Sequence, residues 1–485
     1  MRMEPREKRR VNRFELTPEP CAAGAFKGYV GLDRINSAAV RRTTSRFTHL
    51  MHHLNEFNLR RAFRDLDGSK ASGIDQVTKR DYEQNLQPNL ANLIREIQRG
   101  GWRPKPSREK LIPKPTGGFR PLAIGCLEDK IVQNLCAKIL EAIYEPIFRD
   151  VSYGFRRGKS AHQALARLHQ EIRLREDSCV VVEMDLEKFF NTIPHEKLMA
   201  LISQRITDTS FLRILKRMLR NSILSEEGVA RVNEEGTPQG SPISPILSNI
   251  YLHYALDEWF LANWADRGQM VRYADDAAFV FRSEEDAIAF KRALAARLEE
   301  YGIRVNEEKS GSVRFNRHNP EGDISFLGFV LFWGSSATKR TILKAKTAPK
   351  KVAASIARFT EWIKEKRCRY PLSKLWTLAA AKLRGHYNYY GVSTNGAKLA
   401  HFYHECTLAL FKWLNRRSQK RSYTWEGFLT RLNFSPLPKP PPGRDLVDIM
   451  NGLGTKLKHK PKSRMRKLRK SGSVRSSGRK RPLFT

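Results

Sequence analysis

The sequence has little cysteine and no paired cysteine motif. Only six cysteines occur among 485 residues, and no two of them are separated by just two residues. This scarcity argues against zinc sites and a disulfide framework, and it suits a reducing compartment. No stretch approaches the ~18 apolar residues of a membrane-spanning helix, and the basic first ten residues lead into no apolar segment of a secretory signal. We therefore expect a cytoplasmic protein with no membrane partner.

Acidic residues are scarce relative to basic ones. The 88 Lys and Arg residues outnumber 50 Asp and Glu, which gives a formal net charge of +38 and a pI near 10.2. Residues 456–481 contain 13 basic residues and no acid, so 38 − 13 leaves +25 on the rest of the chain. Such a charge attracts polyanions, nucleic acid first among them, and would associate the protein with the nucleoid when it binds DNA. A surface that only keeps the protein soluble is the alternative.

A turn near the middle of the chain lacks the glycine that such turns usually carry. Two short β-prone runs, 270–273 and 277–281, flank the adjacent carboxylates Asp275 and Asp276. A tight hairpin tip usually contains Asn-Gly or Asp-Gly, because positive φ is needed there. Two like charges side by side repel each other and invite a cation, for which a divalent metal is the natural candidate. A solvated turn is the alternative, and a third carboxylate would argue against it.

Asp185 is a candidate for the third carboxylate. It ends the run 179–185, which predicts a buried strand, and functional carboxylates are common at the carboxyl ends of strands. An Asp that caps the next turn is the alternative.

The order of elements around these carboxylates predicts an α+β fold. Strand, helix, strand, strand, helix and strand follow one another, as in the ferredoxin-like split unit, with the strands at 180–185, 270–273, 277–281 and 303–305. In this topology Asp185, Asp275 and Asp276 would converge. Three carboxylates at one rim could hold two Mg²⁺ ions and support nucleotidyl transfer.

The rest of the chain is predicted to be mainly helical, after an extended basic arm at 1–45. Helices are expected over 47–66, 79–99, 127–148 and 284–301. One further helix is expected to begin at Ser160, and another to end at about residue 264. A β-hairpin with strands near 109–113 and 119–123 would place Lys114 and Arg120 beside a glycine turn, as a cradle for a triphosphate. A solvated basic hairpin is the alternative. The run 326–333 predicts one apolar strand with a central glycine.

Several short motifs occur in a fixed order along the chain. They are Tyr153-Gly-Phe-Arg156, Asp185 with Phe189-Phe190, Thr237-Pro-Gln-Gly-Ser-Pro-Ile-Ser-Pro245, Tyr273-Ala-Asp-Asp276 and Phe326-Leu-Gly-Phe329. In order and spacing, from about residue 47 to 437, they resemble the bacterial group II intron reverse transcriptase/maturase family. The combination is highly specific.

The resemblance implies a right-hand polymerase with fingers, a ferredoxin-like palm, an α-helical thumb or maturase domain, and a basic tail. The expected divisions are an N-terminal arm at 1–45, an N-terminal extension and fingers at 46–178, the palm at 179–335, the thumb at 336–420, and a nucleic-acid-binding segment with the tail at 421–485. The tail is expected to be disordered and to bind nucleic acid through its charge, with a solubilising tail as the alternative.

The resemblance also implies roles for individual residues. Asp185, Asp275 and Asp276 would be catalytic and bind two Mg²⁺ ions, with the Leu186 carbonyl completing a site. Incoming deoxynucleoside triphosphates would be bound by Lys114, Arg120, Phe190, Gln239, Gly240 and Lys309, where Phe190 would reject a ribose 2′-hydroxyl and Lys309 would serve as an acid. Leu327 and Gly328 would support the primer end.

The C-terminal segments 383–391, 411–417 and 422–426 resemble the thumb of the family, and they predict basic helices with exposed aromatics that grip RNA. Residues expected to bind nucleic acid are Arg156, Arg384, Tyr387, Lys412, Arg416 and Arg417. Ser241 and Ala277 depart from residues common in the family, but neither change removes a metal ligand. No paired-cysteine, histidine-rich endonuclease module is recognised after the thumb, so target-DNA cleavage by this chain is not expected.

The function implied is RNA-directed DNA synthesis by a protein that binds group II intron RNA, assists its splicing and copies it during intron mobility. The expected partners are the intron RNA, an RNA template with a DNA primer, target DNA and a second copy of the chain in a homodimer. Two alternatives remain open: a maturase that only assists splicing, and a reverse transcriptase that acts in defence or repair.

Overall fold

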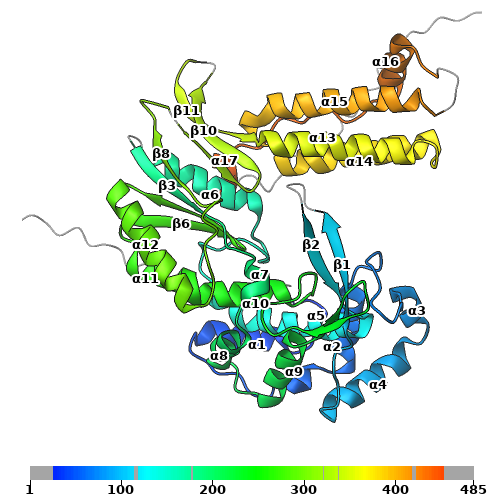
Figure 1. The fold of residues 1–485 in the computed structure, drawn as a ribbon, viewed down its shortest axis with the longest axis vertical. Coiled ribbons are helices and arrows are strands. Elements are labelled where there is room, and N and C mark those ends of the chain that lie inside the picture. Colours follow the sequence, from blue (N-terminus) through cyan, green and yellow to red (C-terminus); the bar gives the residue numbers. More distant parts are fainter. Residues whose placement is uncertain are drawn as a thin grey trace, which may run out of the picture.

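Three hydrophobic clusters organise the protein in the computed structural model, which describes residues 26–113, 118–175, 178–320, 322–336, 338–417 and 422–452. Figure 1 shows a helical part at the bottom, a β-sheet above it, and a group of long helices at the top. The first cluster joins the bottom helices to one face of the central sheet, the second covers the other face, and the third lies within the top helices.

The N-terminal helices surround one long, almost wholly buried helix, α5. Their bounds are α1 (Leu32–Arg41), η1 (Leu50–His53), α2 (Glu56–Asp65), α3 (Lys79–Gln84), α4 (Leu86–Gln98), α5 (Leu127–Tyr144), η2 (Glu145–Ile147) and α6 (Ala161–Arg173). Two predicted helices are each divided, because Asn55 caps the start of α2 and Asn85 leaves the helical conformation between α3 and α4. Ser160 caps α6 as predicted, through a hydrogen bond from the Gln163 N–H.

The extended arm predicted at 1–45 is wrong for its C-terminal part. Residues 32–41 form α1, which buries Leu32 and Ala39 against α5. The buried residues of α1 lie three and four residues apart on one face of the helix, but the pattern covers only about three turns and was not recognised as a helix in the sequence. Residues 1–25 lie outside the described part of the chain.

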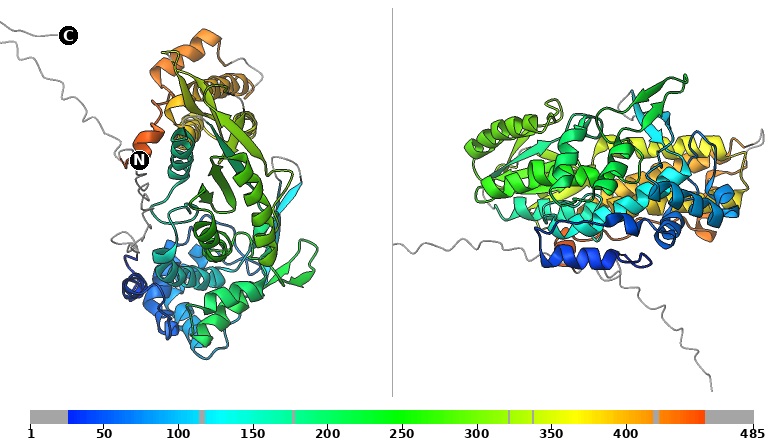
Figure 2. Two further views of the ribbon diagram at one scale, coloured as in Figure 1. Left: turned by 90° about the vertical axis from the view of Figure 1, so that its left-hand side faces the viewer. Right: turned by 90° about the horizontal axis from the view of Figure 1, so that it is seen from below.

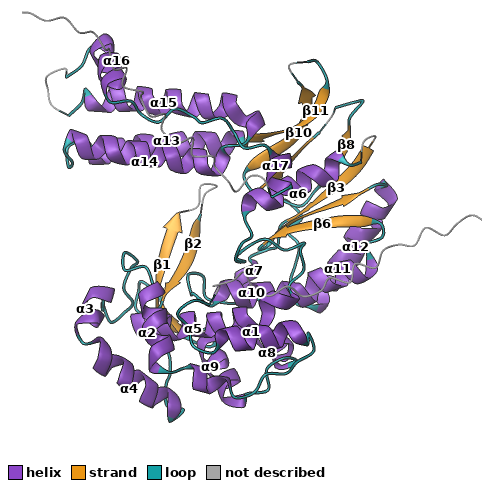
Figure 3. Ribbon diagram, turned by 180° about the vertical axis from the view of Figure 1, so that it is seen from behind, coloured by secondary structure: helices purple, strands orange, loops and turns teal. Residues whose placement is uncertain are grey.

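The predicted β-hairpin is confirmed and belongs to a small sheet with the strand order β2-β1-β4-β5. The strands are β1 (Ser107–Pro113), β2 (Phe119–Ile124), β4 (Ser222–Leu224) and β5 (Ala230–Val232). In Figures 1 and 3 the β1–β2 hairpin rises from the bottom helices toward α13 and α14.

The central sheet has the strand order β6-β7-β3-β8, with every neighbouring pair antiparallel. The strands are β3 (Ser178–Met184), β6 (Gly268–Tyr273), β7 (Asp276–Phe281) and β8 (Ser312–Asn316). This is the order of the split β-α-β-β-α-β unit. The last strand was predicted at 303–305, however, and lies at 312–316; Val305 makes only a single bridge, to Leu186.

The two faces of the central sheet carry alternate residues of each strand. Val180 and Val182 point into the first cluster, toward the connecting helices, whereas Val181 points into the second, toward α6. The helices between and after the strands are α7 (Phe189–Thr192), α8 (His195–Ser203), α9 (Thr209–Leu219), α10 (Ser244–Leu252), the π-helical turn η3 (His253–Asp257), α11 (Glu258–Asn263) and α12 (Glu284–Glu300).

The single strand predicted at 326–333 is wrong, because the chain reverses direction there. Leu327 and Gly328 both have positive φ, 51° and 79°, which is the backbone of a tight hairpin turn. They join β9 (Asp323–Phe326) to β10 (Phe329–Ser335), and β11 (Thr341–Thr347) completes a sheet of order β11-β10-β9. The continuous apolar sequence gave no sign of the turn, because leucine rarely adopts the positive φ that the first position of this loop requires.

The C-terminal helices are α13 (Pro349–Lys366), α14 (Leu372–Tyr390), η4 (Ser393–Asn395), α15 (Gly396–Leu414), α16 (Trp425–Phe434) and α17 (Leu446–Met450). The third cluster includes Phe428 and Leu437, which lie beyond 420, the predicted end of the helical thumb. The chain then returns to the central sheet, where α17 packs on α6 and buries Leu446 in the second cluster (Figure 2). Within the described ranges, no helix is long and apolar enough to cross a membrane.

Candidate active site

The two adjacent carboxylates stand at the tip of a β-hairpin. Asp276 begins β7 and pairs with Tyr273 at the end of β6, so Ala274 and Asp275 form a two-residue loop. The positive φ that a tight hairpin needs falls on Ala274, at 59°. This conformation costs a residue other than glycine about 1 kcal/mol, so the surrounding structure must hold the loop in place.

Arg272 holds this loop from inside the protein. Its side chain and that of Asp257 are fully buried, and Nε and Nη2 donate to the two Asp257 carboxylate oxygens at 2.7 and 2.6 Å. Nη1 donates to the Ala274 carbonyl at 2.9 Å and to Asn249 Oδ1 at 3.1 Å. Asp257 ends the π-helical turn η3. The guanidinium therefore ties the hairpin tip to a neighbouring helix through charge-assisted hydrogen bonds.

A glycine lets a second loop press against the hairpin. The Arg272 N–H donates to the Val151 carbonyl at 2.7 Å, and the Tyr153 N–H donates to the Arg272 carbonyl at 2.8 Å. A Cβ atom on Gly154 would lie 2.2 Å from the Ala274 nitrogen. Only glycine fits at this contact, so the hairpin tip is held on two sides.

Arg156 lies in the same loop and points inward. Its side chain is only 5% exposed, pairs with Glu145 at 2.8 Å, and donates to the carbonyls of Arg149 and Ser152 at 2.6 and 2.8 Å. These contacts close the loop and use the guanidinium fully. The structure therefore contradicts the predicted contact of Arg156 with nucleic acid.

Asp185 follows β3 directly and is bound by the loop before β8. Its carbonyl accepts from the Asn306 N–H at 2.8 Å, and its own N–H donates to Ser310 Oγ at 3.1 Å. The carboxylate accepts from Asn306 Nδ2 at 3.3 Å and pairs with Lys309 Nζ at 3.2 Å. Lys309, which was predicted to lie near the triphosphate, therefore contacts one of the three carboxylates.

The three carboxylates lie close enough to affect one another's protonation. Burial, followed by the charges of Asp275 and Asp185, raises the pKa of Asp276 to about 7. Burial also raises the pKa of Asp275, and the charge of Asp185 adds to this effect. Among the described residues no three His, Cys, Asp or Glu side chains are placed so that they could hold one metal ion together. The three carboxylates therefore share one electrostatic environment at this rim without forming a preformed three-carboxylate metal site.

The chemistry of this rim suits magnesium, which prefers oxygen ligands and a few carboxylates. Leu186 makes a single β-bridge to Val305. The hydrogen bonds of this bridge come from its neighbours: the Asp185 carbonyl accepts from the Asn306 N–H, and the Glu187 N–H donates to the Arg304 carbonyl. The part of the Leu186 carbonyl in a metal site stays a prediction. Three repelling carboxylates supply oxygen donors of the kind that Mg²⁺ prefers.

A hollow of about 390 Å³ brings Phe190 and Gln239 together beside β2. Gln239 Nε2 donates to Asn191 Oδ1 at 3.0 Å, and the Gln239 carbonyl accepts from the Ala123 N–H at 2.9 Å. Gly240 has a φ of 100°, which glycine adopts readily. Two predicted nucleotide-binding residues, Phe190 and Gln239, thus line one hollow between the small sheet and α7, and Gly240 follows Gln239 in the chain.

Arg120 connects the β1–β2 hairpin to the carboxylates. It is exposed on β2, and its charge lowers the pKa of Asp275 against the larger effect of burial. The hairpin therefore brings a cation close enough to interact with Asp275, and the binding of a triphosphate by Arg120 stays a prediction. Lys114 lies outside the described residues.

The turn at Leu327 and Gly328 lies near the same rim. Tyr389 Oη donates to the Leu327 carbonyl at 3.0 Å, and burial, with smaller effects from neighbours that include Asp276, raises the Tyr389 pKa to about 12. A Cβ on Gly328 would lie 3.7 Å from Lys351, whose charge lowers the Asp276 pKa. The turn predicted to support the primer end thus lies beside Tyr389 and Lys351, two residues that interact electrostatically with Asp276.

The predicted nucleic-acid-binding residues of the C-terminal helices differ in exposure. Tyr387 is only 3% exposed within the third cluster, so its predicted contact with nucleic acid is contradicted, whereas Arg384 is exposed. Lys412 and Arg416 lie 5.9 and 5.2 Å from the centre of the Trp413 ring, in a basic cluster at the end of α15. Arg417 lies there too and donates to a backbone carbonyl at 3.2 Å.

Sequence reasoning missed the residues that position the carboxylates. The hairpin tip is held by Arg272, which is bound in turn by Asp257 and Asn249. Asp185 is held by Asn306 and Ser310. One signal was present, because an arginine within an apolar strand requires a buried partner. The identity of that partner could not be read from the sequence.

Comparisons with known proteins agree with this geometry. Residues 112–331 match the family model described as reverse transcriptase (RNA-dependent DNA polymerase). The chain is 31% identical over 280 residues to protein YkfC of Escherichia coli K12, a match that covers 50% of this chain and 72% of that protein. It is 32% identical over 232 residues to the group II intron-encoded protein LtrA of Lactococcus lactis subsp. cremoris, covering 47% of this chain and 38% of LtrA.

A further relative is an uncharacterized 91 kDa protein in a cob intron of Schizosaccharomyces pombe, which is 42% identical over 171 residues, 35% of this chain and 20% of that protein. The chain thus matches well under half of the length of two of these three relatives. The matched region contains the strands, the loop and the hairpin that carry the three carboxylates. The chain belongs to the family of group II intron-encoded reverse transcriptases and maturases.

Proposed function

We propose that this protein is an RNA-directed DNA polymerase that binds group II intron RNA, assists its splicing and copies it into DNA during intron mobility. The observation that carries the proposal is the shared environment of Asp185, Asp275 and Asp276 at one end of the central sheet. In the corresponding right-hand architecture, 46–178 supply the fingers, 179–335 the palm, and the helices from 336 onward the thumb.

The chemistry proposed is attack of a primer 3′-oxygen on the α-phosphorus of a deoxynucleoside triphosphate, with pyrophosphate as the leaving group. Two magnesium ions, held by the three carboxylates and the Leu186 carbonyl, would supply activation of the hydroxyl and neutralisation of the developing charge. Arg120 binds the triphosphate by charge. Lys309 is 67% exposed on a loop, so its ammonium can move from Asp185 to the triphosphate and donate a proton to the leaving pyrophosphate.

Selection of the nucleotide is assigned to the hollow beside β2. Phe190 borders it from α7 and would pack under the sugar, where a 2′-hydroxyl would collide with the ring. Gln239 lines this hollow, and Gly240 follows it in the chain; both are assigned to contacts with the base and sugar. Leu327 and Gly328 present the turn that supports the primer end.

The RNA partner is inferred from charge and kinship. The net charge of +38 favours a polyanion, and one relative bears the name group II intron-encoded protein. The exposed cations around Trp413 suit the RNA backbone. A DNA primer on an RNA template and a DNA target complete the proposed set of partners.

Primer extension on an RNA template, with deoxynucleotides and Mg²⁺, tests the proposal. We expect the parent protein to extend the primer and Asp275→Asn/Asp276→Asn to lose at least about a thousandfold in rate, because two metal ligands are removed. The matched control is Asp266→Asn, an exposed carboxylate whose side chain is 72% accessible, and it should retain the parent rate.

Absence of synthesis by the parent would refute the polymerase, as would full synthesis by the double variant. RNA binding, measured on the same proteins, distinguishes the proposed polymerase from a maturase that only assists splicing. That alternative predicts RNA binding and splicing assistance by the parent without any primer extension.

A further inference from the structure

The C-terminal end of α14 is held by side chains from three other segments. The last carbonyls of a helix have no partner within it, so they must accept hydrogen bonds from elsewhere. At the last three residues of α14 the donors are Arg444 to Asn388 at 2.7 Å, His162 to Tyr389 at 2.7 Å, and Asn395 to Tyr390 at 2.8 Å. His162 belongs to α6, Asn395 to η4, and Arg444 to the segment before α17. The helix end therefore has a fixed place beside the central sheet.

The side chain of Tyr389 extends from this helix end to the turn at Leu327 and Gly328. Its Oη donates to the Leu327 carbonyl at 3.0 Å, and its ring lies at 24° to that of Phe329, with 5.9 Å between the ring centres. The ring of Tyr390 lies 5.2 Å from Phe329, and its Oη would be 3.1 Å from a Cβ on Gly328. Two consecutive tyrosines of α14 thus contact the turn and the residue that follows it.

The Tyr389 hydroxyl supports the turn at its strained residue. Leu327 has a φ of 51°, which a leucine keeps only where the surrounding structure holds it. Two backbone contacts assist: the Ala348 N–H donates to the Gly328 carbonyl at 3.0 Å, and the Ser325 N–H donates to Glu183 of β3 at 2.6 Å. The hydrogen bond from Tyr389 is the contribution of α14 to this set.

Tyr389 also lies near the carboxylates. Burial raises its pKa to about 12, and the neighbours that add to this effect are Tyr390, Tyr273 and Asp276. Tyr273 pairs with Asp276 across the β6–β7 hairpin. One side chain of α14 is therefore close enough to bond to the turn and to interact with the hairpin of the carboxylates.

We infer that Tyr389 is a positioning residue for primer extension, because its hydroxyl fixes the turn at Leu327 and Gly328 and thereby sets the primer end relative to the carboxylates. The inference rests on the proposed function, in which this turn supports the primer end. Tyr389 acts through the turn and does not touch the reacting atoms. A small displacement of the primer oxygen slows its attack strongly, since the reacting atoms must be aligned.

The first variant, Tyr389→Phe, removes the hydroxyl and keeps the ring. Addition of one deoxynucleotide is followed in a single turnover, with protein and deoxynucleotide both saturating. We expect the rate constant to fall about tenfold, because a hydrogen bond that orients a reactant is lost. The affinities for primer–template and deoxynucleotide should stay unchanged. A loss of folded protein would instead lower the amplitude of the reaction and leave its rate constant as it was.

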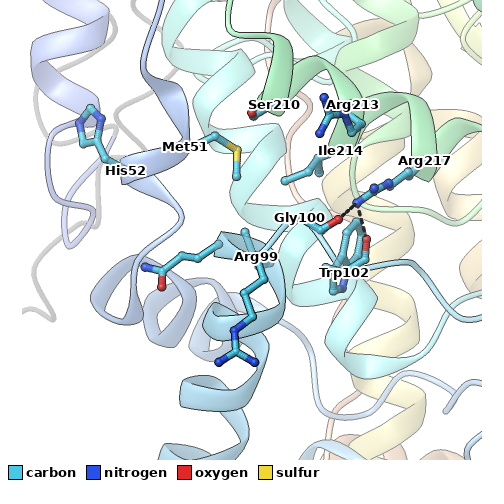
Figure 4. Close-up of a pocket in the computed structure, with 11 residues that line it drawn as sticks. Met51, His52, Arg99, Gly100, Trp102, Ser210, Arg213, Ile214 and Arg217 are labelled. Carbon is cyan, nitrogen blue, oxygen red and sulfur yellow. Dashed lines mark hydrogen bonds between the residues drawn. The ribbon is translucent and has the colours of Figure 1, made fainter.

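Two control variants lose comparable groups elsewhere. Tyr403→Phe removes the hydroxyl of a partly buried tyrosine on α15. Arg217→Met removes a side chain that also bonds to the backbone of another segment: it donates to the carbonyls of Gly100 and Trp102, both at 2.8 Å, beside a hollow of about 400 Å³ (Figure 4). In Figures 1 and 3, α9 lies at the end of the molecule opposite α14. Both controls should keep the parent rate constant, although Arg217→Met should lower the melting temperature.

A variant of the turn shows whether Tyr389 acts through it. Gly328 has a φ of 79°, so Gly328→Ala displaces the backbone that Tyr389 supports. In this background we expect Tyr389→Phe to slow the reaction by less than about twofold, because two changes that act on one structure are not additive. The same loss in both backgrounds would overturn the inference, as would a parent-like rate constant in Tyr389→Phe.

Hydrogen exchange separates this inference from the proposed function, because it needs no activity. The backbone amides of 325–330 should exchange faster in Tyr389→Phe than in the parent or in Tyr403→Phe. A parent that extends no primer would refute the polymerase, even where faster exchange confirms that the hydroxyl holds the turn. Unchanged exchange in Tyr389→Phe, beside an active parent, would refute the role of Tyr389 alone.

Discussion

A fully buried arginine loses the hydration of its charge, and Arg272 offsets that loss with hydrogen bonds to Asp257, Asn249 and the Ala274 carbonyl. Arg272→Met removes the guanidinium and leaves the Asp257 carboxylate buried without its cation. We expect the free energy of unfolding to fall by about 3–5 kcal/mol, measured by urea denaturation.

A second variant separates this stability effect from the positioning of the hairpin. Arg272→Met/Asp257→Leu removes both charges, so most of the lost stability should return. Its kcat in primer extension should stay low while the KM for deoxynucleotide changes little, because the Ala274 carbonyl is no longer held. Full recovery of kcat together with stability would show that Arg272 acts only on the fold.

Asp129 carries a pH dependence that a single variant can isolate. It is only 2% exposed, accepts from the Lys105 N–H at 3.0 Å, and burial raises its pKa to about 7 from 3.8. The native state therefore keeps the Asp129 proton up to a higher pH than the unfolded chain does. Its contribution to stability is complete below about pH 4 and is lost as the pH rises to about 7.

Asp129→Asn removes this group while other carboxylates titrate as before. We expect the stability of the parent relative to the variant to fall by a few kcal/mol between pH 4 and 7 and to remain level above pH 7. The measurement is urea denaturation of both proteins across this range. A constant difference between them would show that the buried carboxyl does not titrate in that window.

At the residue scale, the sequence could supply the carboxylates but not the groups that hold them. Asp275 and Asp276 are the one adjacent pair of aspartates in the sequence, whereas Asp257 belongs to no recognisable motif and is brought to Arg272 by a π-helical turn. Arg156 and Tyr387, in contrast, were predicted to bind nucleic acid although their side chains are buried. Each belongs to a recognisable motif, but motif membership does not reveal burial, and both side chains serve the packing of the fold.

At the element scale, the hairpin of the carboxylates depends on the loop beside it. Gly154→Ala would place a Cβ 2.2 Å from the Ala274 nitrogen, and the backbone must move to relieve that contact. We expect a loss of about 1–3 kcal/mol in stability, as for overpacked sites, together with slower primer extension. Gly101→Ala is the control, because its nearest neighbour, the Glu96 carbonyl, is 3.7 Å away. Equal behaviour of the two alanine variants would contradict a tight contact at the hairpin.

The strands that differ from prediction do so for local reasons. The chain turns at Leu327 and Gly328, where only the glycine signalled a reversal. Residues 306–310 form the loop that binds Asp185, which delays the last strand of the central sheet to β8. The order of strands was predictable because it follows hydrophobic patterning along the whole segment. The bounds depend on side-chain contacts that patterning does not contain.

At the scale of the whole molecule, the C-terminal chain connects parts that are distant in sequence. After α16 it returns past Val392, where the Arg444 N–H donates to the Gly391 carbonyl at 2.9 Å, and α17 then packs on α6. Arg444 also donates to the Asn388 carbonyl at 2.7 Å. The expectation of a segment at 421–485 separate from the thumb could not foresee this return, because long-range packing leaves no local pattern.

This return determines where the basic tail can be removed without damage to the fold. A chain ending at Gly452 keeps α17 but loses 13 Lys and Arg residues. We expect it to keep the stability of the full chain, to bind RNA more weakly and to show a flatter salt dependence, because fewer counterions are released. The measurement is RNA affinity across salt concentrations, beside urea denaturation.

A chain ending at Gly443 is the informative comparison, since it also lacks α17 and the Arg444 contacts. Leu446 is 4% exposed in the second cluster, so this shorter chain should lose stability as well as RNA affinity. The two truncations thus separate a contribution of charge from a contribution of packing. Equal salt slopes for the full chain and the chain ending at Gly452 would mean that the tail carries charge without contacting RNA.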